Sequence, residues 1–285
     1  MKRERRTRRA AALAVCALAA LAALDVRLRT VTYSITTDKL AAPVRLAVLS
    51  DLHSCAYGPG QRTLLEAVEA AAPDGVLMAG DMVDDALPEE NAWTAIEALA
   101  ADYPCFYVTG NHEWWSGEAE RICRRMEALG VRVLRGEHVS VELQGQCLGI
   151  CGVDDPDAGA LEAELERAGA GLREDTFTIL LAHRPEEMDR YRRFPFDLVV
   201  SGHAHGGQWR LPGLVNGLYA PGQGLFPAHA GGLYDLGETA LLVSRGLARE
   251  STRVPRLFNR PELVLAELLP DCEPGERRRP CETSP

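Results

Sequence analysis

The sequence predicts one α/β domain in which helices cover layers of β-sheet. Between residues 44 and 129, apolar runs typical of strands alternate with segments of helical periodicity. Helices that alternate with strands in this way pack on the faces of a sheet. Of the 285 residues, 46% are hydrophobic and 25% are charged, which is ordinary for a soluble domain with one large core.

The first half of the chain is expected to contain three strands, each followed by a helix. In chain order we expect a strand at 44–50, a helix at 63–72, a strand at 75–79, a helix around 93–99, a strand at 105–109 and a helix at 117–129. In the first helix Leu64, Leu65 and Val68 share one face, as an amphipathic helix requires.

The second half of the chain is expected to contain more β structure. A hairpin is expected from 139–143 and 147–153 across Gln144, Gly145 and Gln146. In chain order there follow a helix at 161–168, strands at 177–182 and 198–201, and further β structure at 234–246 and 263–269. The residues after Pro270 are polar and form an expected tail, which gives a predicted domain of 26–270 and a tail of 271–285.

The N-terminus has the composition of a membrane-targeting segment, assigned to residues 1–25. Six Lys or Arg residues within 1–9 precede fifteen uncharged apolar residues at 10–24. This order fits a signal peptide, with a cleavage site at Ala20-Leu21-Ala22, or an uncleaved signal anchor shorter than the usual span of about 20 residues. Both alternatives place the domain on the extracytoplasmic side of a membrane, anchored or secreted.

The net charge limits the classes of partner that the chain is expected to bind. The net charge is −10 although residues 1–9 are basic, so the body of the chain is strongly acidic. An acidic body argues against binding of long nucleic acids, whereas phosphate substrates remain possible if bound metals reverse the local charge.

Cys105, Cys147 and Cys151 lie in apolar runs and are expected to be buried free thiols, while Cys272 and Cys281 could pair after export.

Five polar motifs carry the candidate chemistry, and each follows an apolar run. They are Asp51-Leu52-His53, Gly80-Asp81, Gly110-Asn111-His112-Glu113, His183 and Gly202-His203-Ala204-His205. Asp, Asn and His supply the oxygen and nitrogen ligands of a two-metal hydrolytic site. In an extended segment Asp51 and His53 would face the same way and reach one ion. Each motif alone has an ordinary structural explanation, so the prediction depends on their occurrence together.

Four side chains, two in the third motif and two directly after it, are expected to lie around the metals rather than bind them. His112 is placed to exchange a proton near a leaving group, and Glu113 suits a supporting carboxylate at a helix start. Trp114 and Trp115 could form an apolar wall for a substrate, or could pack into the core.

The five motifs together resemble the signature of the calcineurin-like metallophosphoesterases, D-x-H, G-D, G-N-H-D/E, H and G-H-x-H. Farther along, Gly206-Gly207-Gln208, Tyr219-Ala220-Pro221 and Ser244-Arg245-Gly246-Leu247 resemble a membrane-associated bacterial subgroup similar to the Bacillus YkuE protein. The resemblance implies a four-layer α/β/β/α sandwich with two divalent metal ions, drawn from Mn, Fe and Zn, at the strand ends.

The resemblance also implies a role for each motif residue. It assigns the first metal to Asp51, His53, Asp81 and His205. It assigns the second metal to Asp81, Asn111, His183 and His203, so that Asp81 bridges the two ions. In the implied reaction a hydroxide activated by both metals attacks phosphorus, and His112 is the catalytic residue that protonates or stabilises the leaving oxygen.

The expected substrate is a phosphodiester, phosphomonoester or pyrophosphate, with membrane placement favouring a lipid- or cell-wall-linked ester. The alternatives are a UDP-2,3-diacylglucosamine pyrophosphatase-like hydrolase, which some relatives of the subgroup are, and a phosphodiesterase of soluble nucleotides. A non-catalytic binding module is the least favoured hypothesis, because such a scaffold would be expected to lose ligands and this chain retains them all.

Overall fold

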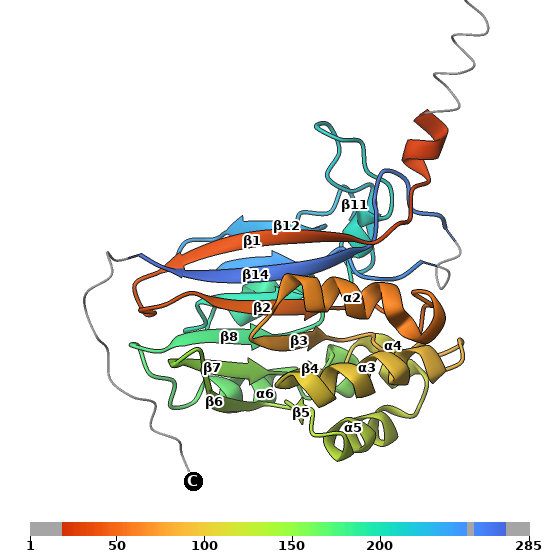
Figure 1. Ribbon diagram of the computed structural model, residues 1–285. Helices are drawn as coiled ribbons and strands as arrows, with labels where there is room; N and C mark the ends of the chain where they lie inside the picture. Colours follow the sequence, from red (N-terminus) through yellow and green to blue (C-terminus); the bar gives the residue numbers. More distant parts are fainter. Residues whose placement is uncertain (1–18, 250–253, 272–285) are drawn as a thin grey trace, which may run out of the picture.

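Two six-stranded sheets face each other in the structure, a computed structural model that describes residues 19–249 and 254–271. A two-stranded ribbon, β10 (Tyr219–Ala220) and β11 (Gly224–Leu225), lies at one end of the molecule (Figure 1). The observed fold is therefore mixed α/β with two sheets, as the sequence predicts.

The first sheet contains the three strands expected in the first half of the chain. Its order is β1 (Arg29–Thr37), β14 (Glu262–Pro270), β2 (Val44–Leu49), β3 (Gly75–Ala79), β4 (Cys105–Val108) and β5 (Arg132–Val133). Strands β2 to β5 run parallel, and β14 is antiparallel to β2. The helices α2 (Arg62–Ala71), α3 (Glu90–Asp102) and α5 (Ala119–Ala128) agree with the predicted helices to within a few residues.

The second sheet is built from the hairpin and the strands that follow it. Its order is β12 (Gly232–Asp235), β13 (Ala240–Val243), β9 (Leu198–Ser201), β8 (Phe177–Leu181), β7 (Gln146–Gly152) and β6 (Glu137–Leu143). Strands β13, β9, β8 and β7 are parallel, with antiparallel neighbours at both edges. The expected helix at 161–168 is α6 (Leu161–Gly169).

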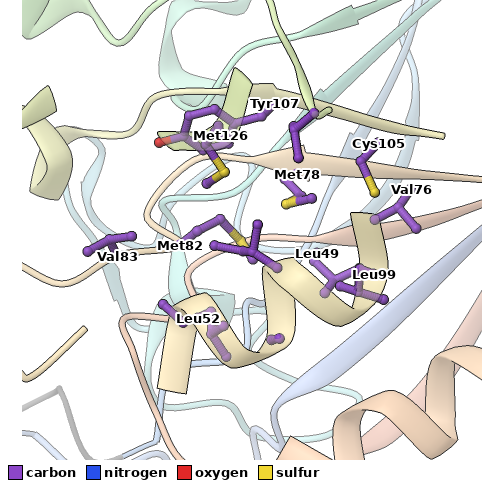
Figure 2. Packing of buried hydrophobic residues seen from close by; sticks show 14 of the residues in the cluster. Leu49, Leu52, Val76, Met78, Met82, Val83, Leu99, Cys105, Tyr107 and Met126 are labelled. Carbon is purple, nitrogen blue, oxygen red and sulfur yellow. The ribbon is translucent and has the colours of Figure 1, made fainter. Parts of the chain in front are cut away.

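The core consists of three apolar clusters that separate four layers. One lies between the first sheet and α2, α3 and α5, and it includes Leu49 and Met78 of the sheet and Leu99 of α3 (Figure 2). A second cluster fills the space between the sheets, and a third lies between the second sheet and the helices α6 and α7 (Met188–Tyr191). Alternate residues of one strand point into different clusters, which is the period-two pattern of a strand buried on both faces.

Several elements were not predicted from the sequence. Strand β1 pairs in parallel with β14, but apart from the buried Ile35 its residues are exposed or half-buried, so it lacks the apolar run that marks the central strands. The helix α4 (Asn111–Trp115) is a single short turn, and 3₁₀ helices cover Pro59–Gln61, Pro156–Ala158, Pro185–Glu187 and His205–Gly207. Segments of this length carry too few residues for periodicity to register.

The cysteine predictions were partly wrong. Cys105 and Cys151 are free and buried, as expected. Cys147, expected as a buried free thiol, is half-buried and disulfide-bonded. The apolar run that follows Cys147 suggested burial, but Cys147 lies near the start of β7, where burial is incomplete. Cys272 and Cys281 lie outside the described residues.

Most of the predicted targeting segment lies outside the described residues, which begin at Ala19. Residues 19–23 are helical, and the amide of Phe258 donates a hydrogen bond to the carbonyl of Ala23 at 2.7 Å. Within residues 19–249 and 254–271, no helix has the length and apolar character needed to span a bilayer. The domain limits at 26 and 270 stay predictions.

Candidate metal centre

The carboxyl ends of five strands bring the motif residues together. Strands β2, β3 and β4 of one sheet lead into Asp51, Asp81 and Asn111, and strands β8 and β9 of the other lead into His183 and His203. Ligand atoms of Asp51, His53 and His205 lie within 4.8 Å of one another, and so do those of Asp81, His183 and His203. Residues separated by about 150 positions in the sequence thus converge, because the parallel strands of each sheet end at one edge and these two edges lie beside each other.

Each aspartate keeps one carboxylate oxygen free of hydrogen bonds. Oδ1 of Asp51 accepts the amide hydrogen of His203 at 2.9 Å, and Oδ1 of Asp81 accepts that of His112 at 2.8 Å. Both side chains are completely buried, and Oδ2 of each has no hydrogen-bond partner. The backbone therefore orients each carboxylate and leaves Oδ2 available to a ligand.

Two buried histidines likewise have one ring nitrogen next to a hydrogen-bond partner and the other left without one. Nδ1 of His183 lies 2.7 Å from the carbonyl oxygen of Ala79, and Nδ1 of His53 lies 3.0 Å from Oδ2 of Asp84. Their Nε2 atoms are buried without hydrogen bonds, at 3.1 and 3.6 Å from Oδ2 of Asp81. Metal-binding histidines are commonly oriented by such a carbonyl or carboxylate on the other ring nitrogen. Oδ2 of Asp81 occupies the position between the two histidines that a bridging ligand needs.

Three of the candidate ligands are held in the protonation state that binds cations. Burial and the neighbouring His183 lower the pKa of His203 to about 3. Burial and the nearby His53 lower the pKa of His205, so both imidazoles are neutral at neutral pH. Burial raises the pKa of Asp81, but His183 and His53 outweigh this and hold it well below its usual range. Neutral imidazoles and ionised carboxylates are the forms that bind metals. Burial lowers the pKa of His53 and His183, but the nearby carboxylates outweigh burial and raise both values, so a metal ion bound there would displace a proton.

The unpartnered polar atoms provide a test of whether these residues fit metal ions. Buried atoms without hydrogen bonds include Asp51 Oδ2, His53 Nε2, Asp81 Oδ2, Asn111 Oδ1 and His183 Nε2. Leaving such atoms unsatisfied costs about 1–3 kcal/mol each, more for charged groups. One or two divalent cations would satisfy them together, and mixed oxygen and nitrogen donors suit Mn, Fe or Zn. The residues present therefore fit the expected ions.

The backbone at these residues adopts a conformation that side chains rarely tolerate. The φ angle is positive at Asp51, His53, Asp81, His203 and His205, with values from 46° to 64°. The expectation that Asp51 and His53 face the same way in an extended segment was therefore wrong, because a left-handed turn brings them together. Strain of this kind costs about 1–3 kcal/mol per residue and collects at functional sites.

His112 lies at the exposed side of the cluster, on the first turn of α4. Its side chain is 23% exposed, and its ring stands edge-on to His53 with 4.3 Å between centroids. Nδ1 lies 2.7 Å from Oδ1 of Asp85, so Nε2 is the nitrogen left for a substrate. Sequence reasoning missed Asp84 and Asp85, although three acids between Asp81 and Asp85, directly after a strand, could have indicated them.

Glu113 has the supporting role expected for it. Its Oε2 accepts hydrogen bonds from the amides of Asp81 and Gly110, at 3.0 and 2.8 Å, and Oε1 accepts one from Val83 at 3.0 Å. The carboxylate thereby joins the start of α4 to the loop that carries Asp81. Burial and the nearby Asp81 raise the pKa of Glu113 to about 7.

The two adjacent tryptophans differ in their surroundings. Trp114 is half-buried, and its Nε1 donates to Oγ1 of Thr109, which makes it a packing residue. Trp115 is 59% exposed, and its ring centroid lies 4.8 Å from that of His112. Its Nε1 donates a hydrogen bond to Oδ2 of Asp157 at 2.8 Å, which fixes the indole beside the cluster. Of the two, only Trp115 is placed to contact a substrate.

Glu186 is a further carboxylate that sequence reasoning missed. Its Oε1 lies 3.4 Å from Nε2 of His203, and its Oε2 is buried without a hydrogen bond. No feature of the surrounding sequence distinguishes it from the neighbouring Glu187, which is why only the structure identifies it.

The comparisons with known proteins agree with this geometry. A family model described as calcineurin-like phosphoesterase matches residues 44–207, the stretch that carries all five motifs. The chain belongs to the calcineurin-like phosphoesterase family. Members of the family use divalent metal ions, and the chain is a hydrolase of phosphoric ester bonds.

Similar proteins are found in several bacteria. Phosphodiesterase YaeI of Escherichia coli is 30% identical over 242 residues, covering 80% of this chain and 83% of its own length. YpbG of Bacillus subtilis is 29% identical, covering 85% of this chain and 87% of its own. The metallophosphoesterase YkuE of the same species is 27% identical, covering 79% and 78%. The likeness to YkuE expected from the C-terminal motifs is thus confirmed, whereas the membrane association of the subgroup stays a prediction.

Proposed function

We propose that the chain hydrolyses a phosphoester at a two-metal centre. Asp51, His53, Asp81 and His205 would hold one ion, and Asp81, Asn111, His183 and His203 would hold the other. The observation that carries this proposal is the convergence of buried, unpartnered ligand atoms around Oδ2 of Asp81. Two divalent cations here would supply a water of lowered pKa and neutralise the charge of the phosphoryl oxygens.

The residues around the metals have separable roles. Glu113 holds the backbone of Asp81 and Gly110 and so fixes the bridging carboxylate. His112, whose Nδ1 faces Asp85, keeps Nε2 for the leaving oxygen, to which it donates a proton or a hydrogen bond. Trp115 supplies an apolar wall beside His112 for the group attached to that oxygen.

We propose a lipid- or cell-wall-linked diester as the substrate class. The phosphodiesterase YaeI supports a diester, and the exposed indole of Trp115 supports an apolar leaving group. The basic residues of 1–9 and the apolar run of 10–24 support a domain held at the outer face of a membrane, or secreted after cleavage. This placement disfavours a cytoplasmic nucleotide-lipid pyrophosphate and leaves soluble nucleotides as the main alternative.

The test is hydrolysis of bis(p-nitrophenyl) phosphate by the full chain, with and without added Mn²⁺. Asp81→Asn should abolish turnover, because it removes the carboxylate shared by both ligand groups. His112→Ala should lower kcat about 10²–10⁴-fold while the metal content stays that of the wild type. Near wild-type turnover of Asp81→Asn would refute the two-metal assignment. Loss of metal from His112→Ala would instead make His112 a ligand or a support.

A further inference from the structure

Exposed apolar side chains gather at one end of the molecule. Among the described residues, ten of the eleven large hydrophobic side chains that are exposed lie in the segments 21–24, 209–226 and 254–258, which we call the apolar surface. The most exposed are Leu214 at 80%, Leu21 at 71%, and Leu225 and Phe226 at 68% each. Soluble proteins rarely leave such groups together in water, so the apolar surface indicates a contact with something apolar.

Hydrogen bonds hold the three segments of the apolar surface side by side. The amide of Phe258 donates to the carbonyl of Ala23 at 2.7 Å, which joins the third segment to the first. Nε1 of Trp209 donates to the carbonyl of Pro255 at 2.9 Å, which joins the third segment to the second. Figure 1 shows the loop around β11, the N-terminal helical turn and the loop before β14 gathered at the same end.

An apolar groove connects this surface with the metal ligands. It has a volume of about 430 Å³, and its apolar lining includes Trp209, Leu218, Tyr219 and Val254. His205, a residue of the candidate metal centre, also lines it. A groove of this size and composition suits a hydrocarbon chain attached to a group that reaches the metals.

The sequence of the N-terminal segment indicates that a lipid bilayer covers the apolar surface. The fifteen uncharged residues at 10–24 follow a basic stretch and enter the described structure at this surface, where Ala23 bonds to Phe258. A segment of that composition partitions into lipid, and Trp, Tyr and Phe are favoured at the membrane interface. A bilayer would therefore lie against the same end of the domain.

We propose that the apolar surface rests in the headgroup region of a lipid bilayer, and that the groove takes the acyl chain of a lipid phosphoester. The phosphate of that lipid would then reach the metal residues past His205 without leaving the membrane surface. This inference depends on the phosphoesterase function proposed above and adds to it the route and the apolar part of the substrate.

Fluorescence quenching by lipid tests the contact directly. The full chain is reconstituted into phosphatidylcholine vesicles with and without bromine on the acyl chains, and tryptophan emission is compared between wild type and Trp209→Phe. The wild type should show quenching that Trp209→Phe largely lacks, because Trp209 lies at the lipid. Equal fractional quenching in the two proteins would overturn the contact, and concentration-dependent dimerisation alongside it would assign the surface to a second copy.

A pair of serine variants separates the apolar surface from general effects of substitution. Leu214→Ser with Leu225→Ser should reduce the quenching of Trp209 while hydrolysis of bis(p-nitrophenyl) phosphate in solution stays at the wild-type level. The matched control is Ala101→Ser with Ala128→Ser, at exposed positions of α3 and α5, which should change neither reading. Unchanged quenching in the leucine pair would contradict the proposal.

Inhibition by alkyl phosphates tests the groove. From butyl to octyl phosphate the inhibition constant against bis(p-nitrophenyl) phosphate should fall, by up to about fourfold per methylene if burial is complete. Tyr219→Ser should flatten this dependence, and equal inhibition by both compounds would overturn the groove. Absence of bis(p-nitrophenyl) phosphate hydrolysis by the wild-type chain with Mn²⁺ would instead overturn the phosphoesterase function, so the two failures are distinguishable.

Discussion

The substitution Gly110→Ala should disable the metal centre without altering any ligand. Gly110 has φ −109° and ψ −175°, an extended conformation that alanine adopts without strain. An added Cβ would lie 2.2 Å from Oδ1 and 2.5 Å from the backbone nitrogen of Asp81. Because unstrained contacts between such atoms need roughly 3.5 Å, Asp81 and Gly110 must separate by about 1 Å.

The size of the effect follows from that displacement. Overpacking of a buried site costs about 1–3 kcal/mol, which corresponds to a fall in Tm of about 2–4 °C per kcal/mol in a chain of this size. A shift of about 1 Å at a reacting group costs on the order of 100-fold in rate. We therefore expect Gly110→Ala to lose about 100-fold in kcat and part of its bound metal.

The assay compares Gly110→Ala with Gly75→Ala, which lies at the start of the strand leading to Asp81. A Cβ at Gly75 would meet its nearest neighbours, including Cδ2 of Leu46, at 3.4 Å, an ordinary contact. Gly75→Ala should therefore keep wild-type metal content and turnover. Wild-type metal content and kcat in Gly110→Ala would refute the argument that close approach of this backbone positions Asp81.

Three further predictions concern the groups around the ligands. Asp85→Ala should lower kcat about tenfold with metal content unchanged, since His112 loses one charge-assisted hydrogen bond worth ~1.5 kcal/mol; a change below twofold would show that Asp85 does not orient it. Glu113→Ala should lower Tm by roughly 6 °C or more, because three buried amides lose their acceptor at a cost of ~3 kcal/mol or more, and calorimetry showing a shift within about 2 °C would contradict this. Removal of the metal by a chelator should lower the Tm of the wild type by about 5–10 °C, if the metal was present at 100 times its Kd, because bound metal then contributes ~2.7 kcal/mol. The Tm of Asp81→Asn should fall by less, and equal falls in the two proteins would show that the metal stabilises the fold elsewhere.

The strands that were predicted correctly from the sequence are those that are buried in the structure. The strands β2, β3 and β8 are fully or almost fully buried, so their apolar runs were visible in the sequence, and their ends located Asp51, Asp81 and His183. Strand β1 was not predicted because it is half exposed at a sheet edge and lacks such a run. Hydrophobic periodicity reports burial, and where burial is partial the signal fades.

Local geometry at the site was harder to predict than its residues. The separation of two between Asp51 and His53 suggested a common face of a strand, but the positive φ angles show a turn whose shape is set by hydrogen bonds to the loop at Gly80 and Asp81. Glu186 reaches His203 only because the 3₁₀ helix at Pro185–Glu187 packs beside the ligand loop. Contacts of this kind depend on elements far apart in the sequence.

The sequence by itself determined the α/β class, the positions of the central strands along the chain and the identity of the candidate ligands, because each depends on short-range patterns of apolar and polar residues. Only the tertiary structure decided which oxygen of Asp51 and Asp81 is free, that Asp84 and Asp85 face His53 and His112, and that an apolar groove reaches His205. These features arise where the carboxyl edges of the two sheets come together and where three distant segments lie side by side at one end of the molecule. Packing between elements determines such contacts, whereas the residues adjacent to each group in the sequence do not.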